Sequence, residues 1–300
     1  MNNIKIQDEI KECLHTKQPV VALESTVYSQ LGLPAPYNEE TLTQSIGILH
    51  KQKVLPAITA IIDGVARIGI SEHEYERILS AQKKVSIRDL PIALAEKWPV
   101  GVTTVASSLF LAHYAGIPIF ATGGIGGVHK ENPSDISADL SMLSKYPILT
   151  VCAGAKSFLD LEKTLEYLET MGTLILGWNC KEFPSFFSLS SGITLTHTIS
   201  HAEDAARILD TSRTLGNTAG IVVAAPPPQP LNATYIKEII TSVVNSLPPS
   251  KKGSDITPYL LKEIARQTKG KSVSANVALV INNCWIAAQI ALAYTKNFKR

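Results

Sequence analysis

A lysine follows directly on an apolar segment in the middle of the chain. The run ILTVCA at 148–153 leads through Gly154 and Ala155 to Lys156 and then to an amphipathic stretch. This pattern predicts a buried strand followed by a helix, with Lys156 at the helix N-terminus. Desolvation and the positive end of the helix dipole both favour a neutral amine, which is a nucleophile and a Schiff-base former. A lysine that packs its stem on an apolar surface and keeps its charge in solvent gives the same pattern.

Glu24, Asp135 and Asp139 are carboxylates beside other apolar segments. Glu24 ends the apolar run of PVVALEST at 19–26 and is followed by two hydroxyl side chains. It is either a functional carboxylate or an edge carboxylate that caps a local group, because charged residues are seldom buried without a partner. Asp135 and Asp139 lie four residues apart in SDISADL, on either side of Ser137. Two such carboxylates can hold a hard divalent cation together with water, whereas the alternative makes Ser137 or Asp139 a helix N-cap.

A glycine-rich segment and a basic segment could contact an anion. The segment ATGGIGGVH contains four glycines in five residues, which permits positive φ and close approach of a ligand to the backbone. It lacks the third glycine of the dinucleotide-binding fingerprint, so it is as typical of a structural loop as of an anion-binding nest. Lys84 and Arg88 in KKVSIRDLP can supply phosphate contacts or form a solvated basic turn.

These segments need a framework that brings them together. Short β-branched runs alternate with amphipathic stretches, which indicates an α/β fold with a largely parallel sheet covered by helices on both faces (α/β/α). Strands are predicted at 19–26, 57–63, 117–122, 148–153, 173–178 and 220–225, and helices at 38–52, 104–116, 158–172 and 201–216. After the prolines of APPPQP, stretches at about 232–246, 257–268 and 272–295 predict a helical C-terminal layer. We expect one domain, residues 1–300, with the reactive side chains at the carboxyl ends of the strands.

The composition narrows the classes of protein to which the chain can belong. Its 300 residues are 45% hydrophobic, and 28 basic residues against 26 acidic ones give a net charge of +2, which offers no footprint for nucleic acid. The four cysteines are far apart and form no metal-binding spacing, so we expect reduced thiols. No signal-peptide pattern and no run of eighteen apolar residues is present. We therefore expect a soluble cytoplasmic protein that acts on a small molecule, with no nucleic acid or membrane partner.

Taken together, the segments resemble a known enzyme family. The chain contains, in order, VALESTVYSQLGLPAPYN, IIDGVARIGIS, VSIRDLP, GVTTVASSLFLA, FATGGIGGVH, DISADL, VCAGAKSFLDLEKTLEYLET, FPSFF and ANVALVINN. These motifs are similar to those of the pseudouridine-5'-phosphate glycosidase family, and the resemblance covers about residues 19–290. It implies reversible cleavage of the C–C bond of pseudouridine 5'-phosphate to uracil and ribose 5-phosphate, an activity classed with the hydro-lyases. It also implies a divalent metal, usually Mn²⁺, and a homotrimer of a single α/β/α domain.

The resemblance assigns roles to individual residues. Lys156 matches the nucleophile that forms a covalent Schiff-base intermediate, Glu24 matches the proton donor, and Asp135 matches the metal-binding aspartate. The positions that match substrate contacts are Lys84, Val105, Ser137, Ala138 and Asp139. A C-glycoside has no basic leaving atom, so the paired-carboxylate route of ordinary glycosidases would have to expel a carbanion, and a lysine avoids that difficulty.

Three departures from the family pattern bear on substrate affinity. Ile87 stands where the family commonly has arginine, Ala225 stands where it commonly has asparagine, and the loop at 129–135 is shorter than expected. We expect these changes to affect phosphate affinity and loop closure and to leave the reaction unchanged. Two other functions fit the residues: a Schiff-base aldolase that acts on a sugar phosphate, and a non-catalytic nucleotide-binding relative that has kept the fold.

Overall fold

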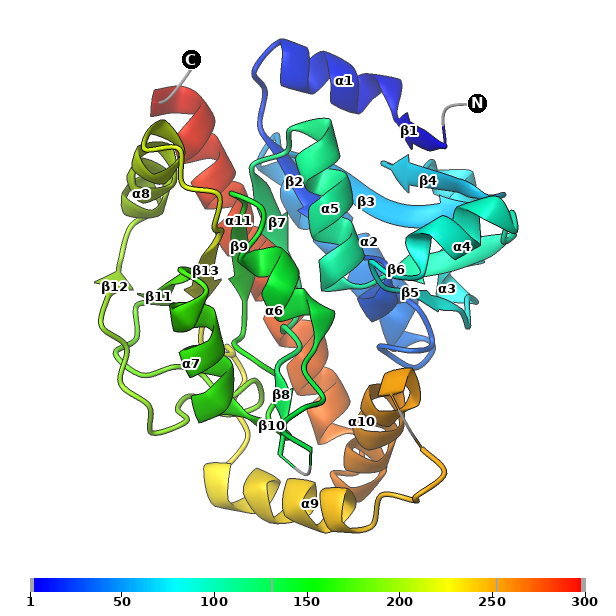
Figure 1. Cartoon of the computed structure of the whole chain (residues 1–300), viewed down its shortest axis with the longest axis vertical. Helices are drawn as coiled ribbons and strands as arrows, with labels where there is room; N and C mark the ends of the chain where they lie inside the picture. Colours follow the sequence, from blue (N-terminus) through cyan, green and yellow to red (C-terminus); the bar gives the residue numbers. More distant parts are fainter. Residues whose placement is uncertain (1–2, 131, 252, 298–300) are drawn as a thin grey trace.

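The computed structural model describes residues 3–130, 132–251 and 253–297, and a sheet of parallel strands runs through its centre (Figure 1). The parallel strands lie in the order β3 (Leu55–Ile62), β2 (Val20–Leu23), β7 (Ile119–Ala121), β9 (Leu149–Cys152), β13 (Ile221–Ala224), β11 (Leu174–Trp178) and β12 (Thr198–Ile199). The chain turns from β2 to β3 on one side and later returns to place β7 on the other side of β2. Such a reversal of strand order opens a crevice at the carboxyl ends of the strands.

One end of the sheet is antiparallel, which the sequence pattern had not predicted. Strand β3 pairs antiparallel with β4 (Val65–Ile68) and with β6 (Val100–Thr103). Beyond them, β1 (Ile4–Ile6) pairs parallel with β4, and β5 (Lys84–Val85) pairs parallel with β6. Asp63 and Gly64 connect β3 to β4 with φ of 51° and 70°. An Asp-Gly pair with both φ positive is the preferred two-residue hairpin turn.

Helices cover both faces of the sheet, as predicted. On one face α11 (Lys271–Asn297) packs on β2, β7 and β9 and is flanked by α2 (Tyr37–Lys51) and α8 (Ala202–Thr214). On the other face α5 (Val105–Ala115), α6 (Ala138–Leu143) and α7 (Leu161–Thr170) lie side by side (Figure 1). The largely parallel α/β/α fold is therefore confirmed.

The remaining helices lie around this three-layer core. Helices α9 (Ala233–Asn245) and α10 (Ile256–Gln267) form the predicted C-terminal layer with α11 and contact each other. The shorter elements are α1 (Asp8–His15), α3 (Tyr75–Leu79), α4 (Leu90–Ala95), β8 (Val128–His129), β10 (Leu159–Asp160) and the 3-10 turns η1 (Thr26–Tyr28), η2 (Glu72–Glu74) and η3 (Gly253–Asp255). Strands β8 and β10 pair antiparallel outside the main sheet.

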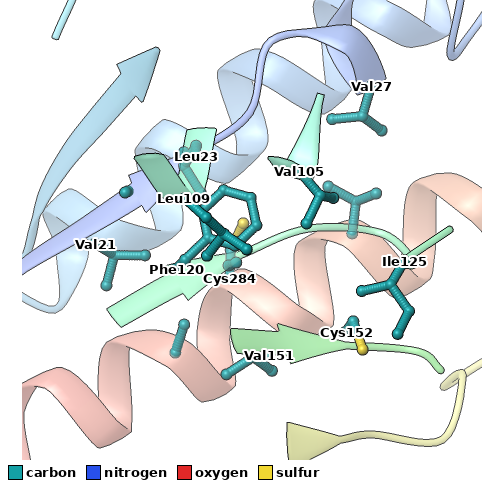
Figure 2. Packing of buried hydrophobic residues seen from close by; sticks show 14 of the residues in the cluster. Val21, Leu23, Val27, Val105, Leu109, Phe120, Ile125, Val151, Cys152 and Cys284 are labelled. Carbon is teal, nitrogen blue, oxygen red and sulfur yellow. The ribbon is translucent and has the colours of Figure 1, made fainter. Parts of the chain in front are cut away.

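The core beneath the strand ends is apolar and fully packed. Leu23, Phe120 and Val151 lie on β2, β7 and β9, and each is at most 1% exposed. Figure 2 shows them in one cluster with Leu109 of α5 and Cys284 of α11. Each large apolar side chain removed from water contributes roughly 1.5–3 kcal/mol, and dense packing keeps its neighbours in place. The strand ends therefore form a rigid support for the residues that follow them.

The predicted position of Lys156 at a helix N-terminus is wrong. Helix α7 begins five residues later at Leu161, and the Asp160 carboxylate caps it by accepting from the Lys163 backbone N–H at 3.1 Å. Lys156 lies instead in the turn after β9, where Gly154 has a φ of 84°. An aspartate is a strong N-cap and a lysine is not, so the helix starts where a cap is available.

Helix α11 is long and apolar, although the sequence contains no uninterrupted run of eighteen apolar residues. Its 27 residues and mean hydropathy satisfy the length and composition of a spanning helix, and 56% of its most apolar window is buried inside the fold. Core helices of globular proteins meet the same criterion, so this feature is weak evidence for membrane insertion.

Candidate functional site

A cavity of about 300 Å³ lies at the carboxyl ends of β2, β7 and β9, next to the reversal of strand order. Every site residue predicted from the sequence lines it: Glu24, Lys84, Val105, Asp135, Ser137, Ala138, Asp139 and Lys156. They come from segments that are up to 132 positions apart, from 24 to 156, and the parallel sheet brings them together. Their chemical roles stay predictions.

Glu24 is a buried carboxyl at the end of β2. Its side chain is 7% exposed, and the Thr122 hydroxyl donates a hydrogen bond to its Oε1. Burial raises the pKa of Glu24 to about 7, although Lys156 and the Thr122 hydrogen bond act in the opposite direction. A carboxyl with this pKa still carries its proton in part of the molecules at neutral pH, which suits a general acid.

Lys156 is attached to the glycine-rich segment by side chain and backbone. Its Nζ donates to the Gly124 carbonyl oxygen at 3.2 Å, and its backbone N–H donates to the Ile125 carbonyl at 3.1 Å. The Ile125 N–H in turn donates to the carbonyl of Gly154 at 3.1 Å. The turn after β9 and the loop after β7 therefore form one unit that presents the amine to the cavity.

The glycines of this loop are needed for space. Gly124 and Gly126 have no positive φ, in contrast to the conformational freedom expected from the sequence. A Cβ on Gly124 would lie 2.5 Å from the Phe186 ring, and one on Gly126 would lie 2.2 Å from Ser137 Oγ. Such distances are shorter than any real contact, so only glycine allows the loop to pack against its neighbours.

Asp139 joins this loop to the start of α5. Its Oδ1 accepts from the Ala106 N–H at 3.0 Å, its Oδ2 accepts from the Gly126 N–H at 2.8 Å, and the residue is 6% exposed. Of the two residues predicted as alternative N-caps, Ser137 caps α6: its Oγ accepts from the Asp139 N–H at 3.2 Å. Both carboxylate oxygens of Asp139 already accept hydrogen bonds from backbone N–H groups. The residue therefore holds the glycine-rich loop against the start of α5 and fixes this part of the cavity wall.

Two lysines make one end of the cavity positive. Lys84 on β5 is half-buried, and its pKa is lowered first by burial and then by the nearby Lys156 ammonium. Val105 begins α5, and the N-terminus of this helix carries partial positive charge, part of which the Asp139 carboxylate offsets by accepting from the Ala106 N–H. Arg88 lines the same cavity, although its side chain is 81% exposed beside Asp89. Cations that are held close together against their repulsion are typical of a site for phosphate.

The surroundings of Asp135 fit a divalent cation only if water supplies most of the ligands. The Asp135 backbone carbonyl accepts from the His129 N–H at 3.1 Å, and burial is the main cause that lowers the His129 pKa, with Asp135 opposing it. Within the described residues, no three His, Cys, Asp or Glu side chains come together as a metal centre. A hard cation here would take Asp135 as its protein ligand and complete its shell with water.

Sequence reasoning missed three further residues of the cavity. Asn276 on α11 is 6% exposed, and its Oδ1 has no hydrogen-bond partner within the described structure, so it can receive a donor from a ligand. His129 and Phe186 complete the wall. The motifs FATGGIGGVH, FPSFF and ANVALVINN contained these residues, but nothing in their local pattern distinguishes them from core positions.

Two of the departures from the family pattern lie away from the cavity. Ile87 packs in an apolar pit beside Leu90 and Phe110, while its neighbours Ser86 and Arg88 line the site. Ala225 follows directly on β13 and is fully buried. The third departure, the loop at 129–135, contains residue 131, which lies outside the described residues.

Comparison with known sequences assigns the chain to a family. The family model described as indigoidine synthase A like protein matches residues 9–293. A pseudouridine-5'-phosphate glycosidase of Staphylococcus aureus (strain MW2) is 46% identical over 98% of this chain and 97% of its own length. The enzyme of the same name from Brachyspira hyodysenteriae is 43% identical over 98% and 99%. The chain belongs to the pseudouridine-5'-phosphate glycosidase family.

Solved structures agree with this membership of the pseudouridine-5'-phosphate glycosidase family. An indigoidine synthase A-like protein from Thermotoga maritima superposes with a TM-score of 0.89 at 31% identity, over 97% of this chain and 96% of that one. The prealnumycin C-glycosynthase AlnA, solved in complex with ribulose 5-phosphate, gives a TM-score of 0.88 at 29% identity, over 98% and 97%. The fold therefore occurs in a protein that binds a pentose phosphate.

Proposed function

We propose that the chain catalyses the reversible conversion of pseudouridine 5'-phosphate and water to uracil and ribose 5-phosphate, through a covalent intermediate on Lys156. The observation that supports this most directly is the pairing of a buried carboxyl with a pKa of about 7 and a lysine amine in one cavity. A relative that is 46% identical carries the name of this activity. The proposed class is a lyase, because a bond is broken before water enters.

The substrate is expected to lie with its phosphate at the positive end of the cavity. Lys84 and the start of α5 at Val105 provide the positive charge for the dianion. The proposed substrate contacts at 137–139 follow from the same placement, because this segment forms the wall next to the start of α5. The base then extends toward Asn276, whose free Oδ1 can accept from an N–H of uracil.

In the first proposed step the ribose ring opens. Glu24 gives its proton to the ring oxygen as the C1'–O4' bond breaks, and electrons from the base ring form a double bond between C1' and C5 of the pyrimidine. The positive charge of Lys156 near Glu24 stabilises the carboxylate that remains after this transfer. Burial keeps water away from the acid until the proton moves.

In the second step the Lys156 ammonium gives a proton to the Glu24 carboxylate, and the neutral amine that remains adds to C1' and forms an N–C bond as the electrons of the C1'–C5 double bond return to the pyrimidine. A proton at C5 of the pyrimidine then lets the C1'–C5 bond break, which leaves uracil and an iminium between C1' and the lysine nitrogen. Water adds to the iminium carbon and releases ribose 5-phosphate as the aldehyde, together with the free amine. Every bond that breaks is matched by one that forms, and no redox partner is required.

A divalent cation such as Mn²⁺ is proposed at Asp135, held mostly by water. When bound, it would neutralise negative charge and order water at the edge of the cavity. Asp135 and the adjacent His129 are the side chains placed to hold it or its waters.

We also propose a cytoplasmic homotrimer. Four free thiols are consistent with a reducing compartment, and sedimentation of the purified protein tests the assembly.

Synthesis is the direction that tests the proposed function. The protein is incubated with uracil, ribose 5-phosphate and Mn²⁺, and the expected product has the summed mass of the two substrates minus one water. An aldolase would instead join ribose 5-phosphate to a carbonyl donor without uracil, and a binding protein would produce nothing. Absence of the C-nucleotide while either other outcome is obtained refutes the proposal.

A further inference from the structure

One short segment of backbone touches both reactive groups of the site. The Thr122 hydroxyl donates to Glu24, and the Gly124 carbonyl two residues later accepts from Lys156 Nζ at 3.2 Å. The segment Thr122–Gly124 directly follows β7. Its position therefore determines where the acid lies with respect to the amine, and small displacements of it would change both contacts.

A buried asparagine from the opposite layer holds this segment. Asn283 on α11 donates through Nδ2 to the Thr122 carbonyl at 2.8 Å and to the Gly123 carbonyl at 3.2 Å. The backbone groups of these two residues also bond to β9 and its end: the Thr122 N–H donates to the Val151 carbonyl at 3.0 Å, and the Gly123 carbonyl accepts from the Ala153 N–H at 2.8 Å. Asn283 alone ties the segment, among these bonds, to the helical layer.

The environment of Asn283 indicates that its amide is there for these bonds. The residue is 0% exposed in the apolar part of α11, next to Cys284 and near Val280. Asparagine is a weak helix former, and a buried polar group without a partner costs about 1–3 kcal/mol. Its Oδ1 has no partner within the described structure. An apolar side chain would pack at this position without that cost, so the two donated bonds are what the asparagine adds.

We propose that Asn283 is a positioning residue of the active site, which keeps the Thr122–Gly124 segment where Thr122 can hold Glu24 and Gly124 can hold Lys156. Its contribution to turnover rests on the function proposed above, whereas its effect on Glu24 does not. Replacement of the amide should loosen the segment and weaken the Thr122 hydrogen bond, which favours the ionised carboxyl.

The charged and titratable groups around Glu24 define what a titration would report. They are Lys156 from the turn after β9, Asp139 from α6, Lys84 from β5 and Tyr28 from η1. The lysines and the Thr122 bond favour the carboxylate, while Asp139 favours the protonated form. Loss of the Thr122 bond and retreat of Lys156 act in the same direction. Both should raise the pH at which Glu24 loses its proton.

The first experiment reads Glu24 directly and needs no substrate. The protein is labelled with ¹³C at the glutamate carboxyls, and the Glu24 signal is assigned by its loss in Glu24→Gln and titrated by NMR. In Asn283→Leu the midpoint should rise by about one pH unit. Asn282→Leu, at the preceding residue of the same helix, is the matched control and should leave the midpoint unchanged. If Asn283→Leu does not fold, Asn283→Ala serves the same purpose.

A double-mutant cycle tests whether Asn283 acts through Thr122. Thr122→Val removes the hydroxyl and should raise the midpoint by a similar amount, whereas Thr122→Ser should restore it. In the Thr122→Val background, Asn283→Leu should raise the midpoint by less than it does in the wild type, because only the effect of Lys156 remains. Full additivity, or an unchanged midpoint in folded Asn283→Leu, overturns the proposal.

The second experiment reads Lys156. Borohydride trapping with ribose 5-phosphate should be at least tenfold slower in Asn283→Leu than in the wild type, because the amine is no longer aligned, while Asn282→Leu should react normally. Equal trapping rates in Asn283→Leu and the wild type would overturn the link to the amine. If even the wild type forms no adduct, the proposed reaction is wrong, and the Glu24 titration still decides the role of Asn283.

Discussion

Lys156 lowers the pKa of Glu24, yet burial outweighs this effect and leaves the carboxyl with a pKa of about 7. The two residues follow different strands, β2 and β9, and strand β7 lies between these two. The segment after β7 bonds to both side chains, to Glu24 through Thr122 and to Lys156 through Gly124. The site thus places an acid that is protonated near neutral pH beside an amine. An ordinary surface pair would ionise fully and form a salt bridge. Its carboxylate would have no proton to donate, and its ammonium nitrogen would have no lone pair with which to attack carbon.

Replacement of the lysine is the simplest test of this pairing. We expect Lys156→Ala to abolish turnover and leave the fold intact, because the side chain lies at a cavity wall and its removal creates no void in the packed core. Trapping of the wild type with borohydride and ribose 5-phosphate should add one sugar-phosphate mass at Lys156, measured by peptide mass spectrometry. Lys163→Ala, on the solvent-exposed part of α7, is the control and should trap normally. Full turnover by Lys156→Ala would rule out the covalent route.

The metal prediction concerns Asp135 and can be checked without turnover. Binding of Mn²⁺ is measured by loss of the free-ion EPR signal in wild type, Asp135→Asn and Asp160→Asn. We expect Asp135→Asn to weaken binding by more than the roughly 10- to 100-fold that loss of an outer-shell group costs. Asp160→Asn keeps the cap of α7 outside the cavity and should bind like the wild type. Equal affinities in all three proteins would show that Asp135 is not the ligand.

The framework was predictable from the sequence because its signal is local. The continuous apolar runs that became β2, β9 and β13 mark strands buried on both faces, and the helices α2, α5 and α8 fall within one or two residues of their predicted ends. The carboxyl-end rule then places Glu24 and Lys156 together without any knowledge of distances. The missed hairpin at Asp63-Gly64 also had a local signal, the Asp-Gly pair.

The positions of other site residues depend on contacts between distant parts of the chain, which a local sequence pattern does not indicate. Asn283 bonds to the Thr122 carbonyl across 161 residues, and from the sequence it is one more polar residue in an apolar helix. Lys156 was expected at a helix start because the amphipathic pattern continues backward to it, but Asp160 is the stronger cap and moves the start of α7 to Leu161. Side-chain packing, not periodicity, decides such positions.

Glycine packing gives a prediction about the cavity wall. A Cβ on Gly126 would lie 2.2 Å from Ser137 Oγ and 2.8 Å from Asp139 Oδ2, so Gly126→Ala must displace the loop that holds Lys156. We expect a loss of about 1–3 kcal/mol in the free energy of unfolding and a large loss of activity. Gly47→Ala, in the middle of α2 with nothing within 4 Å of the added Cβ, should instead stabilise the protein by about 0.5–1 kcal/mol. Urea denaturation of both variants checks the contrast, and a Gly126→Ala protein as stable and active as the wild type would contradict it.

The pH dependence of Glu24 is expected in both stability and turnover. The pKa of this carboxyl is about 7 in the fold against an ordinary value of 4.5, so the folded state binds the proton more tightly than the unfolded state between these values. The stabilisation from the protonated carboxyl is therefore complete below pH 4.5 and is lost as the pH rises to 7 and beyond. It amounts to about 3 kcal/mol. Glu24→Gln keeps the shape of the side chain and removes the titrating proton. Between pH 4.5 and pH 8 the free energy of unfolding of the wild type should therefore fall by about 3 kcal/mol more than that of the Glu24→Gln protein.

Turnover of the same two proteins completes the test. Cleavage by the wild type should decline as the pH rises through about 7, because the acid loses its proton. Glu24→Gln should be slower by about 10²–10⁴-fold, the usual contribution of a general acid, with little change in KM, and it should lack that decline. The two measurements separate the possible roles of the residue. A stability difference that follows the predicted pH window, together with unchanged turnover, would make Glu24 a buried structural carboxyl and leave the reaction without its proposed acid.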